Sequence, residues 1–410
     1  MPPTTQVLFV HYGDHWIRGS EMCLLNLIAT LSSRFTAVVW TNNSVMHSKL
    51  QSKNITTYYS EFSLIDLQQR SFSLSKWFGQ YQTATHILAQ HNIGLIHVNS
   101  GAACQWMTLA AKIHNTPLLC QIHSPYNLHD RFTLTLHCAQ QLIAVSHAVA
   151  KPLLNEGYPN SQLAVVHNGI PNTRLSQNID IRQRLNIAQG AKILISVGSL
   201  IHRKGFDKLI QALASLNNTP DEYHLIIIGE GSERLNLIAQ TKRLHLLNNV
   251  HFVGEQSNVG EWLSGGCDLF VSGARSEAFG LVLVEASLAG LAVVAPHVGG
   301  IAEVIEDKVN GLLYQNGHNE IKALTQAIKT LIDDPSLRHT LANNGRQIAK
   351  AHFSLQTNTD NIESIYQQLL NKPSLTWLDL MKGLLRPLKT LFHTRVMRPI
   401  QQQLRGHYDA

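Results

Sequence analysis

Residues 276–290 read S-E-A-F-G-L-V-L-V-E-A-S-L-A-G and contain two carboxylates, Glu277 and Glu285. Eight steps of about 100° each place the two about 80° apart around a helix axis, so one helix does not present both on one face. We therefore predict a helix that begins near Gly280, with Glu277 in the preceding loop and Glu285 in the second turn. Gly290 then ends this helix.

The start of this helix has the features of an anion site. Residues 269–272 form an apolar strand before it, so the helix begins at the carboxyl edge of a sheet. The backbone N–H groups of Gly280, Leu281 and Val282, together with the helix dipole, favour a phosphate there. Carboxylates repel phosphates, so we expect the two glutamates to accept hydrogen bonds from neutral hydroxyls. A nucleotide sugar fits this pattern, and the alternative is a pair of solvated helix charges.

Composition indicates a well-cored globular protein. The 410 residues suffice for two domains and a tail, with 44% hydrophobic and 15% charged residues. Five cysteines without a C-x-x-C pair indicate thiols in a reducing cytosol. The apolar run at residues 7–10 is too short for a signal peptide or a spanning helix. We expect no metal or cofactor, because the chain has neither a D-x-D triplet nor a histidine cluster such as H-E-x-x-H.

Strand-like and helical segments alternate along the chain, which predicts an α/β fold with two parallel sheets, each covered by helices. The predicted helices include residues 21–31 and 102–112. The predicted strands are residues 7–10, 36–40, 95–98, 118–122, 142–145, 163–166, 193–197, 225–228, 269–272 and 292–295. The polar residues 171–178 form the expected linker. Because parallel sheets bind ligands beyond the carboxyl ends of their strands, we expect two Rossmann-like domains that face each other across a cleft.

In the first half, two residues follow predicted strands in positions that suit a ligand. Gly19 lies in the turn H-Y-G-D-H-W-I-R-G-S-E after the first strand, where a glycine lets the backbone approach a phosphate. An ordinary turn between a strand and a helix is the alternative. His123 follows residues 118–122, at a carboxyl end where catalytic groups are often placed. A purely structural histidine is the alternative there.

The second half opens with S-V-G-S-L-I-H-R-K-G-F, in which Gly198 ends a strand and Arg203 and Lys204 follow it. Adjacent cations beside a glycine turn suit a diphosphate, because arginine forms a bidentate fork and lysine is a compact charge. A solvated basic turn is the alternative. Gly254, in F-V-G-E-Q, ends a further strand and lets a flat base lie against the backbone.

Taken together, residues 6–368 resemble the retaining family 4 glycosyltransferases (glycosyl transferases group 1), which have the GT-B architecture. The motifs are R-G-S-E, V-S-H, V-V-H-N-G-I, V-G-S-L-I-H-R-K-G, I-I-I-G-E-G, F-V-G and E-A-F-G-L-V-L-V-E-A-S-L-A-G. The last of these, followed by V-V-A-P-H-V-G-G-I-A-E-V-I, is the most specific. One departure is Arg18 before a single Gly19, where a double glycine is usual.

The resemblance implies a role for each candidate residue. Arg203 and Lys204 would hold the donor diphosphate. Glu285 would bind the ribose hydroxyls and Glu277 those of the transferred sugar. The amides of Gly280, Leu281 and Val282 would contact the phosphate or the sugar. From the first domain, Gly19 would approach the diphosphate and His123 would face the sugar. No divalent metal or other cofactor is implied.

The C-terminal tail carries nearly all of the excess charge, with seven basic and two acidic residues in residues 371–410. A nucleic-acid-binding protein would distribute its basic residues differently, so we expect no nucleic acid partner. Apolar residues recur at steps of three and four, beside Lys382, Arg386 and Lys389. A basic amphipathic helix of this kind can lie on an anionic membrane surface. Packing on the body of the protein or on a partner is the alternative.

The expected domains are therefore residues 1–172, which bind the acceptor, residues 173–370, which bind the nucleotide sugar and end in a closing helix, and the tail 371–410. The resemblance implies a retaining hexosyltransferase that uses a nucleotide-diphosphate sugar and a glycan or lipid-linked acceptor in cell-surface polysaccharide or lipopolysaccharide biosynthesis. We expect a cytoplasmic protein, peripheral at the inner face of the membrane. Alternatives are a nucleotide-sugar epimerase of the same architecture and a noncatalytic nucleotide-sugar-binding scaffold.

Overall fold

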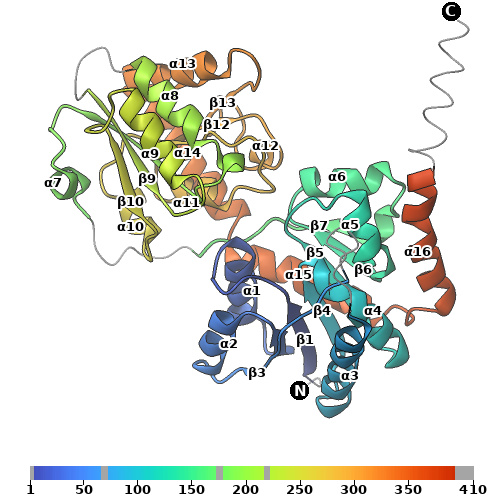
Figure 1. Cartoon of the computed structure of the whole chain (residues 1–410). Helices are drawn as coiled ribbons and strands as arrows, with labels where there is room; N and C mark the ends of the chain where they lie inside the picture. Colours follow the sequence, from blue (N-terminus) through green and yellow to red (C-terminus); the bar gives the residue numbers. More distant parts are fainter. Residues whose placement is uncertain (1–3, 66–72, 172–178, 217–221, 393–410) are drawn as a thin grey trace, which may run out of the picture. The chain divides into compact units, whose positions relative to one another are not determined.

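The computed structural model describes residues 4–65, 73–171, 179–216 and 222–392 (Figure 1). The chain divides into two compact units, one of Met1–His167 with Asn358–Ala410 and one of Asn168–Thr357. Each unit is built on one parallel sheet with helices packed against it, so the predicted class of two Rossmann-like α/β domains is confirmed. Of the expected linker, residues 172–178 lie outside the described residues.

The first sheet has the strand order β3-β2-β1-β4-β5-β6-β7, and every pair of neighbours is parallel. Its strands are β1 (Thr5–His11), β2 (Phe35–Thr41), β3 (Thr56–Tyr59), β4 (Leu95–Asn99), β5 (Leu118–Ile122), β6 (Gln141–Ala144) and β7 (Leu163–Val165). All residues of β4 and β5 are buried, as expected for central strands covered on both faces. The order reverses between β1 and β4, which makes the carboxyl ends of these strands the switch point where open sheets bind ligands.

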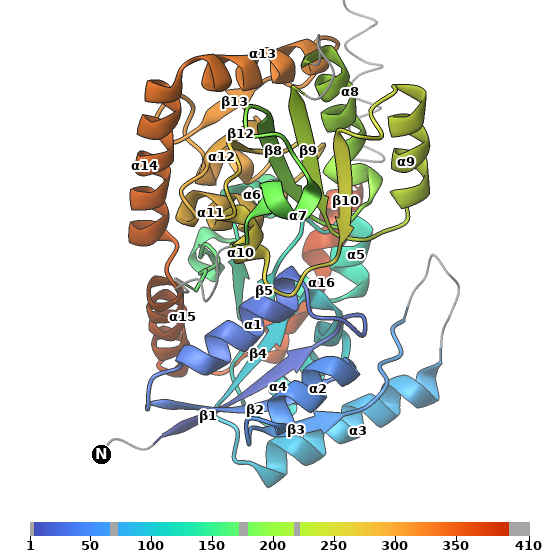
Figure 2. The same ribbon diagram turned by 90° about the vertical axis from the view of Figure 1, so that its left-hand side faces the viewer.

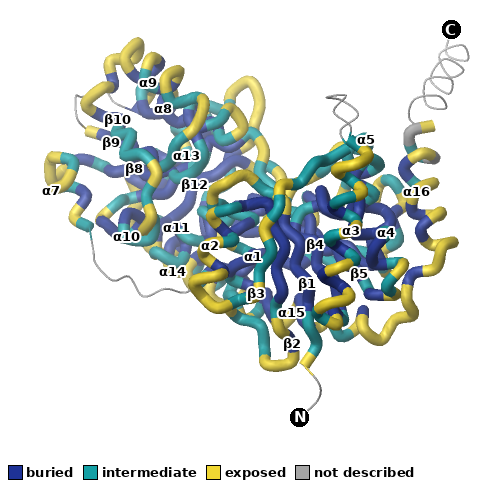
Figure 3. The backbone as a smooth tube through the Cα atoms, turned by 60° about the horizontal axis from the view of Figure 1, so that its bottom comes forward, coloured by how far each residue is buried: buried dark blue, intermediate teal, exposed yellow. Residues whose placement is uncertain are grey.

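The connections of the first unit are helical, and its central strands form the dark-blue interior in Figure 3. The helices are α1 (Gly19–Thr30), α2 (Ser44–Gln51), α3 (Leu74–Gln90), η1 (Gly101–Ala103), α4 (Cys104–Ile113), α5 (Leu128–Thr133), η2 (Leu136–Cys138), α6 (His147–Asn155) and η3 (Asn160–Gln162). Leucines of α1 pack with residues of β1, β4 and β5 in one core cluster. The predicted helix over residues 102–112 is split into η1 and α4.

The second sheet has the order β10-β9-β8-β11-β12-β13, the Rossmann order, and reverses between β8 and β11. Strands β8, β9 and β10 can be followed side by side in Figure 2. Its strands are β8 (Lys192–Val197), β9 (Tyr223–Ile228), β10 (Val250–Gly254), β11 (Leu269–Val271), β12 (Ala292–Pro296) and β13 (Leu312–Tyr314). Its helices are α7 (Ile181–Leu185), η4 (His202–Lys204), α8 (Phe206–Leu216), α9 (Arg234–Arg243), α10 (Val259–Leu263), α11 (Leu281–Leu288), α12 (Ile301–Val304), α13 (Glu320–Asp333) and α14 (Pro335–His352).

The closing helix α15 (Leu355–Leu370) belongs largely to the first unit, whereas the sequence placed it in the second domain. Tyr366 is fully buried in the core of the first unit, and its hydroxyl lies 2.5 Å from Nδ1 of the buried His97 on β4. The carboxylate of Glu363 accepts hydrogen bonds from the backbone N–H and the hydroxyl of Ser32. These contacts pack α15 against the first sheet. They join residues far apart in the chain, so the sequence pattern alone does not reveal them.

The tail helix α16 (Trp377–Phe392) packs on η2 and α5 through one face. Leu380 is buried, and a Cβ placed on Gly383 would lie 2.6 Å from the carbonyl oxygen of His137, so only glycine allows this approach. The opposite face carries exposed apolar side chains, of Trp377, Leu378, Met381, Leu384, Leu385, Leu388 and Phe392. Of the two sequence-based alternatives, packing on the body is therefore confirmed for one face, and the other face remains exposed.

Candidate active site

Two loops of the second unit meet at its switch point because two glycines lie back to back. Gly205 follows η4 with a φ of +65°, and Gly273 follows β11. A Cβ on Gly205 would lie 1.9 Å from the carbonyl oxygen of Gly273, and a Cβ on Gly273 would lie 2.2 Å from that of Gly205. Since no side chain fits between these backbones, the loop that carries Arg203 and Lys204 runs directly beside the loop that carries Glu277.

Arg275 fastens these two loops together. Its backbone N–H donates to the carbonyl of Arg203 at 2.8 Å, and its Nη1 donates to the carbonyl of His202 at 2.9 Å. The guanidinium also forms a two-pronged ion pair with Asp207 in the first turn of α8, at 2.7 and 2.6 Å. This bidentate geometry is the strong form of the arginine–carboxylate interaction. The sequence alone gave no sign of this role of Arg275, because its partners lie far from it in the chain.

Glu277 lies before α11, as predicted, and pairs with both predicted cations. Nζ of Lys204 forms an ion pair with its Oε2, and Nη1 of Arg203 lies 3.7 Å from its Oε1. Oε1 also accepts a hydrogen bond from the N–H of Ala278 at 3.1 Å. Burial alone would raise the pKa of this carboxyl, but the charge and hydrogen bond of Lys204, with Arg203 and Ala278, lower it. Glu277 is therefore an ionised carboxylate that these contacts hold in one position.

Glu285 lies in the second turn of α11, as predicted, and its environment differs from that of Glu277. Burial raises the pKa of its carboxyl to about 7. Among the residues that the structure describes, no hydrogen bond or ion pair to this carboxylate is formed. A ligand whose hydroxyl groups donate hydrogen bonds to a half-buried carboxylate of this kind stabilises its ionised form strongly.

Helix α11 begins as the sequence predicts. Gly280 is its N-cap with a φ of +105°, a backbone conformation that disfavours any side chain. The helix ends at Leu288, two residues before Gly290. Leu281 and Val282 occupy its first two positions, where backbone N–H groups have no acceptor within the helix. These N–H groups and the positive end of the helix dipole suit an anion.

Backbone hydrogen bonds join the carboxyl ends of β8, β9 and β10 in the second sheet. The N–H of Gly198 donates to the carbonyl of Ile228 at 2.9 Å, and the N–H of Gly229 donates to the carbonyl of Gly254 at 2.9 Å. Gly198 and Gly254 therefore lie at the carboxyl ends of the two strands that flank β9. The structure thus gathers the predicted residues of the second half at the carboxyl ends of β8, β10 and β11. Gly19 and His123 belong to the first unit.

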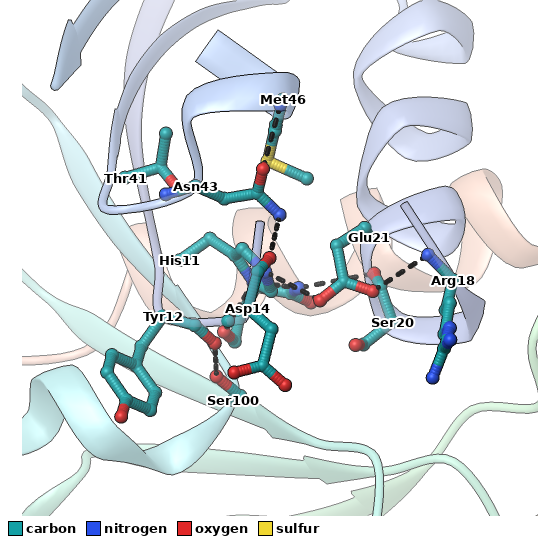
Figure 4. Close-up of polar contacts among 12 residues, drawn as sticks. His11, Tyr12, Asp14, Arg18, Ser20, Glu21, Thr41, Asn43, Met46 and Ser100 are labelled. Carbon is teal, nitrogen blue, oxygen red and sulfur yellow. Dashed lines mark hydrogen bonds and ion pairs between the residues drawn. The ribbon is translucent and has the colours of Figure 1, made fainter. Parts of the chain in front are cut away.

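Gly19 is the first residue of α1, beside a cavity of about 470 Å³ at the switch point of the first sheet. Tyr12, Trp16, Arg18 and Tyr126 are among the residues that line the cavity. The loop between β1 and α1 is clamped by two buried asparagines of the next loop. Nδ2 of Asn43 donates to the carbonyl of Asp14 (Figure 4) and to that of Trp16. Asn42 exchanges two hydrogen bonds with the backbone of Gly13.

His123 stands directly after β5, as predicted, and its Nε2 lies 2.7 Å from Oδ1 of Asn99 at the end of β4. Burial and the neighbouring His11 lower the pKa of His123 to about 4, so its ring is neutral near pH 7. Asn99 also contacts His11, which in turn contacts Glu21. In the sequence, His11, Asn99, His123 and Glu21 are single polar residues, each at the end of a strand or in the first turn of a helix. Their mutual contact depends on the parallel register of β1, β4 and β5.

Comparison with known proteins matches a different family model to each half of the chain. The model described as Glycosyltransferase Family 4 matches residues 17–174, and the one described as Glycosyl transferases group 1 matches residues 177–348. N-acetyl-alpha-D-glucosaminyl L-malate synthase of Bacillus anthracis is 26% identical over 302 residues, which is 69% of this chain and 77% of that protein. The lipopolysaccharide core biosynthesis glycosyltransferase LpsE of Rhizobium meliloti is 33% identical over 192 residues, 47% of this chain and 54% of that protein.

Solved structures show the same architecture. HepE of Anabaena, in complex with UDP and glucose, superimposes with a TM-score of 0.76 at 26% identity, covering 89% of this chain and 100% of that one. A glycosyltransferase from Rickettsia africae has a TM-score of 0.78 at 17% identity, covering 90% of this chain and 99% of that one, and shows the fold alone. The family matches on both halves, with the strand order of both sheets, show that the chain belongs to the family 4 glycosyltransferases of the GT-B fold.

Proposed function

We propose that this glycosyltransferase moves a hexose, with retention of configuration, from a nucleoside-diphosphate sugar to a glycan or lipid-linked acceptor of a cell-surface polysaccharide or lipopolysaccharide. The observation that carries this proposal is the grouping of Arg203 and Lys204 with Glu277 beside the start of α11. In this proposal the second unit binds the donor and the first unit the acceptor. Two similar proteins support the class of reaction, since HepE was solved with UDP-glucose and LpsE is named for the lipopolysaccharide core.

The chemical difficulty of such a transfer is the charge that develops as the sugar–phosphate bond breaks. The diphosphate gains negative charge while the sugar ring becomes positively charged. Arg203, Lys204 and the first N–H groups of α11 can stabilise that negative charge more strongly in the transition state than in the bound donor. Lys204 then divides its hydrogen bonds between the phosphate and Glu277, because an ammonium group has three N–H donors.

The two glutamates bind the sugars on either side of the diphosphate in this proposal. Glu277 accepts from Lys204 and Ala278, and its remaining lone pairs are open to hydroxyls of the transferred sugar. Glu285 binds the ribose hydroxyls, whose protons relieve the cost of burying its carboxylate. The backbone around Gly198 and Gly254 then lies against the base.

Retention follows if the acceptor hydroxyl attacks from the face that the phosphate leaves and the departing phosphate takes its proton. No carboxylate nucleophile is then needed, which agrees with the engagement of Glu277 by two cations. The alternatives are an epimerase, which would convert the donor without an acceptor, and a scaffold, which would bind the donor without turnover.

Donor turnover with and without acceptors distinguishes these functions. We expect the purified protein to consume UDP-hexoses, the first donors to test, only when an acceptor from a lipopolysaccharide or capsule preparation is present. NMR of the product should show the anomeric configuration of the donor. An inverted product would contradict retention, conversion without acceptor would indicate an epimerase, and binding without turnover would indicate a scaffold.

Replacing Lys204 by alanine should lower kcat/KM about a hundredfold, a loss of about 3 kcal/mol of transition-state stabilisation, because one of the charges on the leaving diphosphate is removed. Steady-state kinetics with a fixed acceptor measure this. Lys322→Ala is the matched control, since Lys322 is an exposed cation on α13 of the same unit. Equal kinetics for Lys204→Ala and the control would refute the assignment of this site.

Replacing Glu285 by glutamine should change the pH dependence of stability. The pKa of this carboxyl is about 7 in the folded protein and near 4.5 in the unfolded chain, so its contribution to stability is present below about pH 4.5 and lost as the pH rises through 7. Glu285→Gln should therefore exceed the wild type in stability at pH 8, by at most about 3 kcal/mol, and by no more than about 1 kcal/mol at pH 5.

Urea unfolding of the unliganded proteins at both pH values measures this difference. Glu306→Gln, at an exposed position of the same unit, should show no such gain at pH 8. The same glutamine variant should also bind UDP more weakly than the wild type, because a neutral amide accepts hydroxyl protons less strongly than a carboxylate does. A gain in stability that is equal at pH 5 and pH 8 would show that Glu285 is not desolvated.

We also propose that the exposed face of α16 binds the anionic inner face of a membrane. Three exposed side chains of this face, Trp377, Leu385 and Phe392, are each more than half accessible. Lys382 is exposed on the same helix, and the tail as a whole is basic. An apolar stripe flanked by cations suits the boundary between lipid headgroups and acyl chains. Among the described helices, none is long and apolar enough to span a membrane.

The double variant Leu385→Glu/Leu388→Glu should abolish flotation with anionic vesicles, because two carboxylates would be placed against an anionic surface. Both side chains are exposed, so the contacts of Leu380 and Gly383 with the body are kept. Leu235→Glu, at an exposed leucine of α9, is the control and should float like the wild type. Equal flotation of the double variant and the wild type would exclude membrane binding through α16.

A further inference from the structure

A continuous chain of four polar side chains lies at the switch point of the first sheet. Oε1 of Glu21 is 3.1 Å from Nε2 of His11, Nδ1 of His11 is 2.9 Å from Nδ2 of Asn99, and Oδ1 of Asn99 is 2.7 Å from Nε2 of His123. His11 ends β1, Glu21 lies in the first turn of α1, Asn99 ends β4 and His123 follows β5. His11 and Asn99 have no exposed surface, and Glu21 is 4% exposed.

The orientation of the Asn99 amide is determined by its surroundings. Its Nδ2 lies 3.3 Å from the backbone carbonyl of Ser20, a group that can only accept a hydrogen bond. The NH₂ group therefore faces Ser20, and Oδ1 faces His123. Because Oδ1 is an acceptor, Nε2 of His123 must carry the proton. Nδ1 of His123 is then the acceptor nitrogen of the ring.

His11 and Glu21 support Asn99 from the other side. Nδ1 of His11 accepts from Nδ2 of Asn99 at 2.9 Å, and Nε2–H of His11 donates to the carboxylate of Glu21 (Figure 4). Burial alone would raise the pKa of Glu21, but its interactions with His11 and with the backbone N–H groups of Glu21 and Arg18 lower it. Glu21 is therefore a buried carboxylate that holds the ring of His11 in one orientation.

The neutral state of His123 limits what its ring can do. Its pKa is lowered to about 4 by burial and by His11, against the opposing effect of Glu21, and it also faces the buried His97. A base this weak does not remove the proton of a sugar hydroxyl near pH 7. A neutral nitrogen with a free lone pair is, however, a good acceptor for such a hydroxyl.

We propose that Glu21, His11 and Asn99 are positioning residues that hold His123 as its Nε2–H tautomer, so that Nδ1 accepts a hydrogen bond from a sugar hydroxyl of the bound substrate. This inference rests on the proposed function. It involves no proton transfer, because the hydroxyl keeps its proton and His123 orients the sugar. In this arrangement the residues on β1, α1 and β4 act on the substrate only through His123.

The variant Asn99→Asp tests the chain, because a carboxylate beside Nε2–H favours the protonated ring and raises the pKa of His123. A protonated ring has no acceptor nitrogen. We expect kcat/KM of this variant to be about tenfold lower at pH 6 than at pH 8, with a smaller change in the wild type over this range. Nitrogen-15 NMR should show Nε2–H alone on His123 of the wild type, and both nitrogens protonated in Asn99→Asp at pH 6.

Glu363→Gln is the matched control, since Glu363 is a buried carboxylate of the same unit that is bonded to Ser32 rather than to the chain of four. It should lower the melting temperature without altering the tautomer of His123 or the pH profile. The variant His123→Ala distinguishes the contact of His123 with the sugar from the positioning role of the other three residues. If His123→Ala retains wild-type kinetics, both the hydroxyl contact and the assignment of His123 to the active site fail. If His123→Ala is slow but Asn99→Asp keeps the wild-type tautomer and pH profile, the positioning role alone is overturned.

Discussion

The close approach of Gly205 and Gly273 is the constraint on which the proposed donor site of the second unit depends. A side chain at either position would overlap the carbonyl of the other, so any larger residue would push apart the loops that follow β8 and β11. With the loops in contact, Lys204 and Arg203 meet the carboxylate of Glu277, and the guanidinium of Arg275 bridges to Asp207. The charges are thus placed by backbone packing and then fixed by hydrogen bonds, which limits their reorganisation when a diphosphate binds.

The same arrangement of strands serves both units with different chemistry. In each sheet the strand order reverses beside the first strand, and polar residues gather at the carboxyl ends on either side of that reversal. The second unit gathers cations and helix N–H groups, which suit a diphosphate. The first unit gathers a buried chain of hydrogen bonds that runs from the carboxylate of Glu21 to His123, and Glu21 also lines the cavity of this unit. Such a division suits the binding that we propose, of the donor diphosphate by the second unit and of sugar hydroxyls by the first.

The two C-terminal helices, α15 and α16, complete the first unit and give it an exposed apolar surface. Helix α15 crosses back from the second unit, and the bond between Tyr366 and His97 fastens it beneath β4. Helix α16 then packs through Leu380 and Gly383 and leaves its apolar face exposed. Because α16 contacts α5, which carries residues of the cavity, a surface that binds this face would lie on the unit that we propose to hold the acceptor.

The sequence by itself determined the alternation of strands and helices, the limits of α11 and the loops that carry Arg203, Lys204 and Glu277, because apolar periodicity and glycine positions are local signals. It did not predict β3 or β13, which are short edge strands that are mostly half-buried or exposed, so their apolar patterns are weak. Only the tertiary structure decided that Lys204 pairs with Glu277, that α15 returns to the first unit, and that Asn99 joins His11 to His123. These contacts link residues far apart in the chain, and they form only when parallel strands bring their carboxyl ends together.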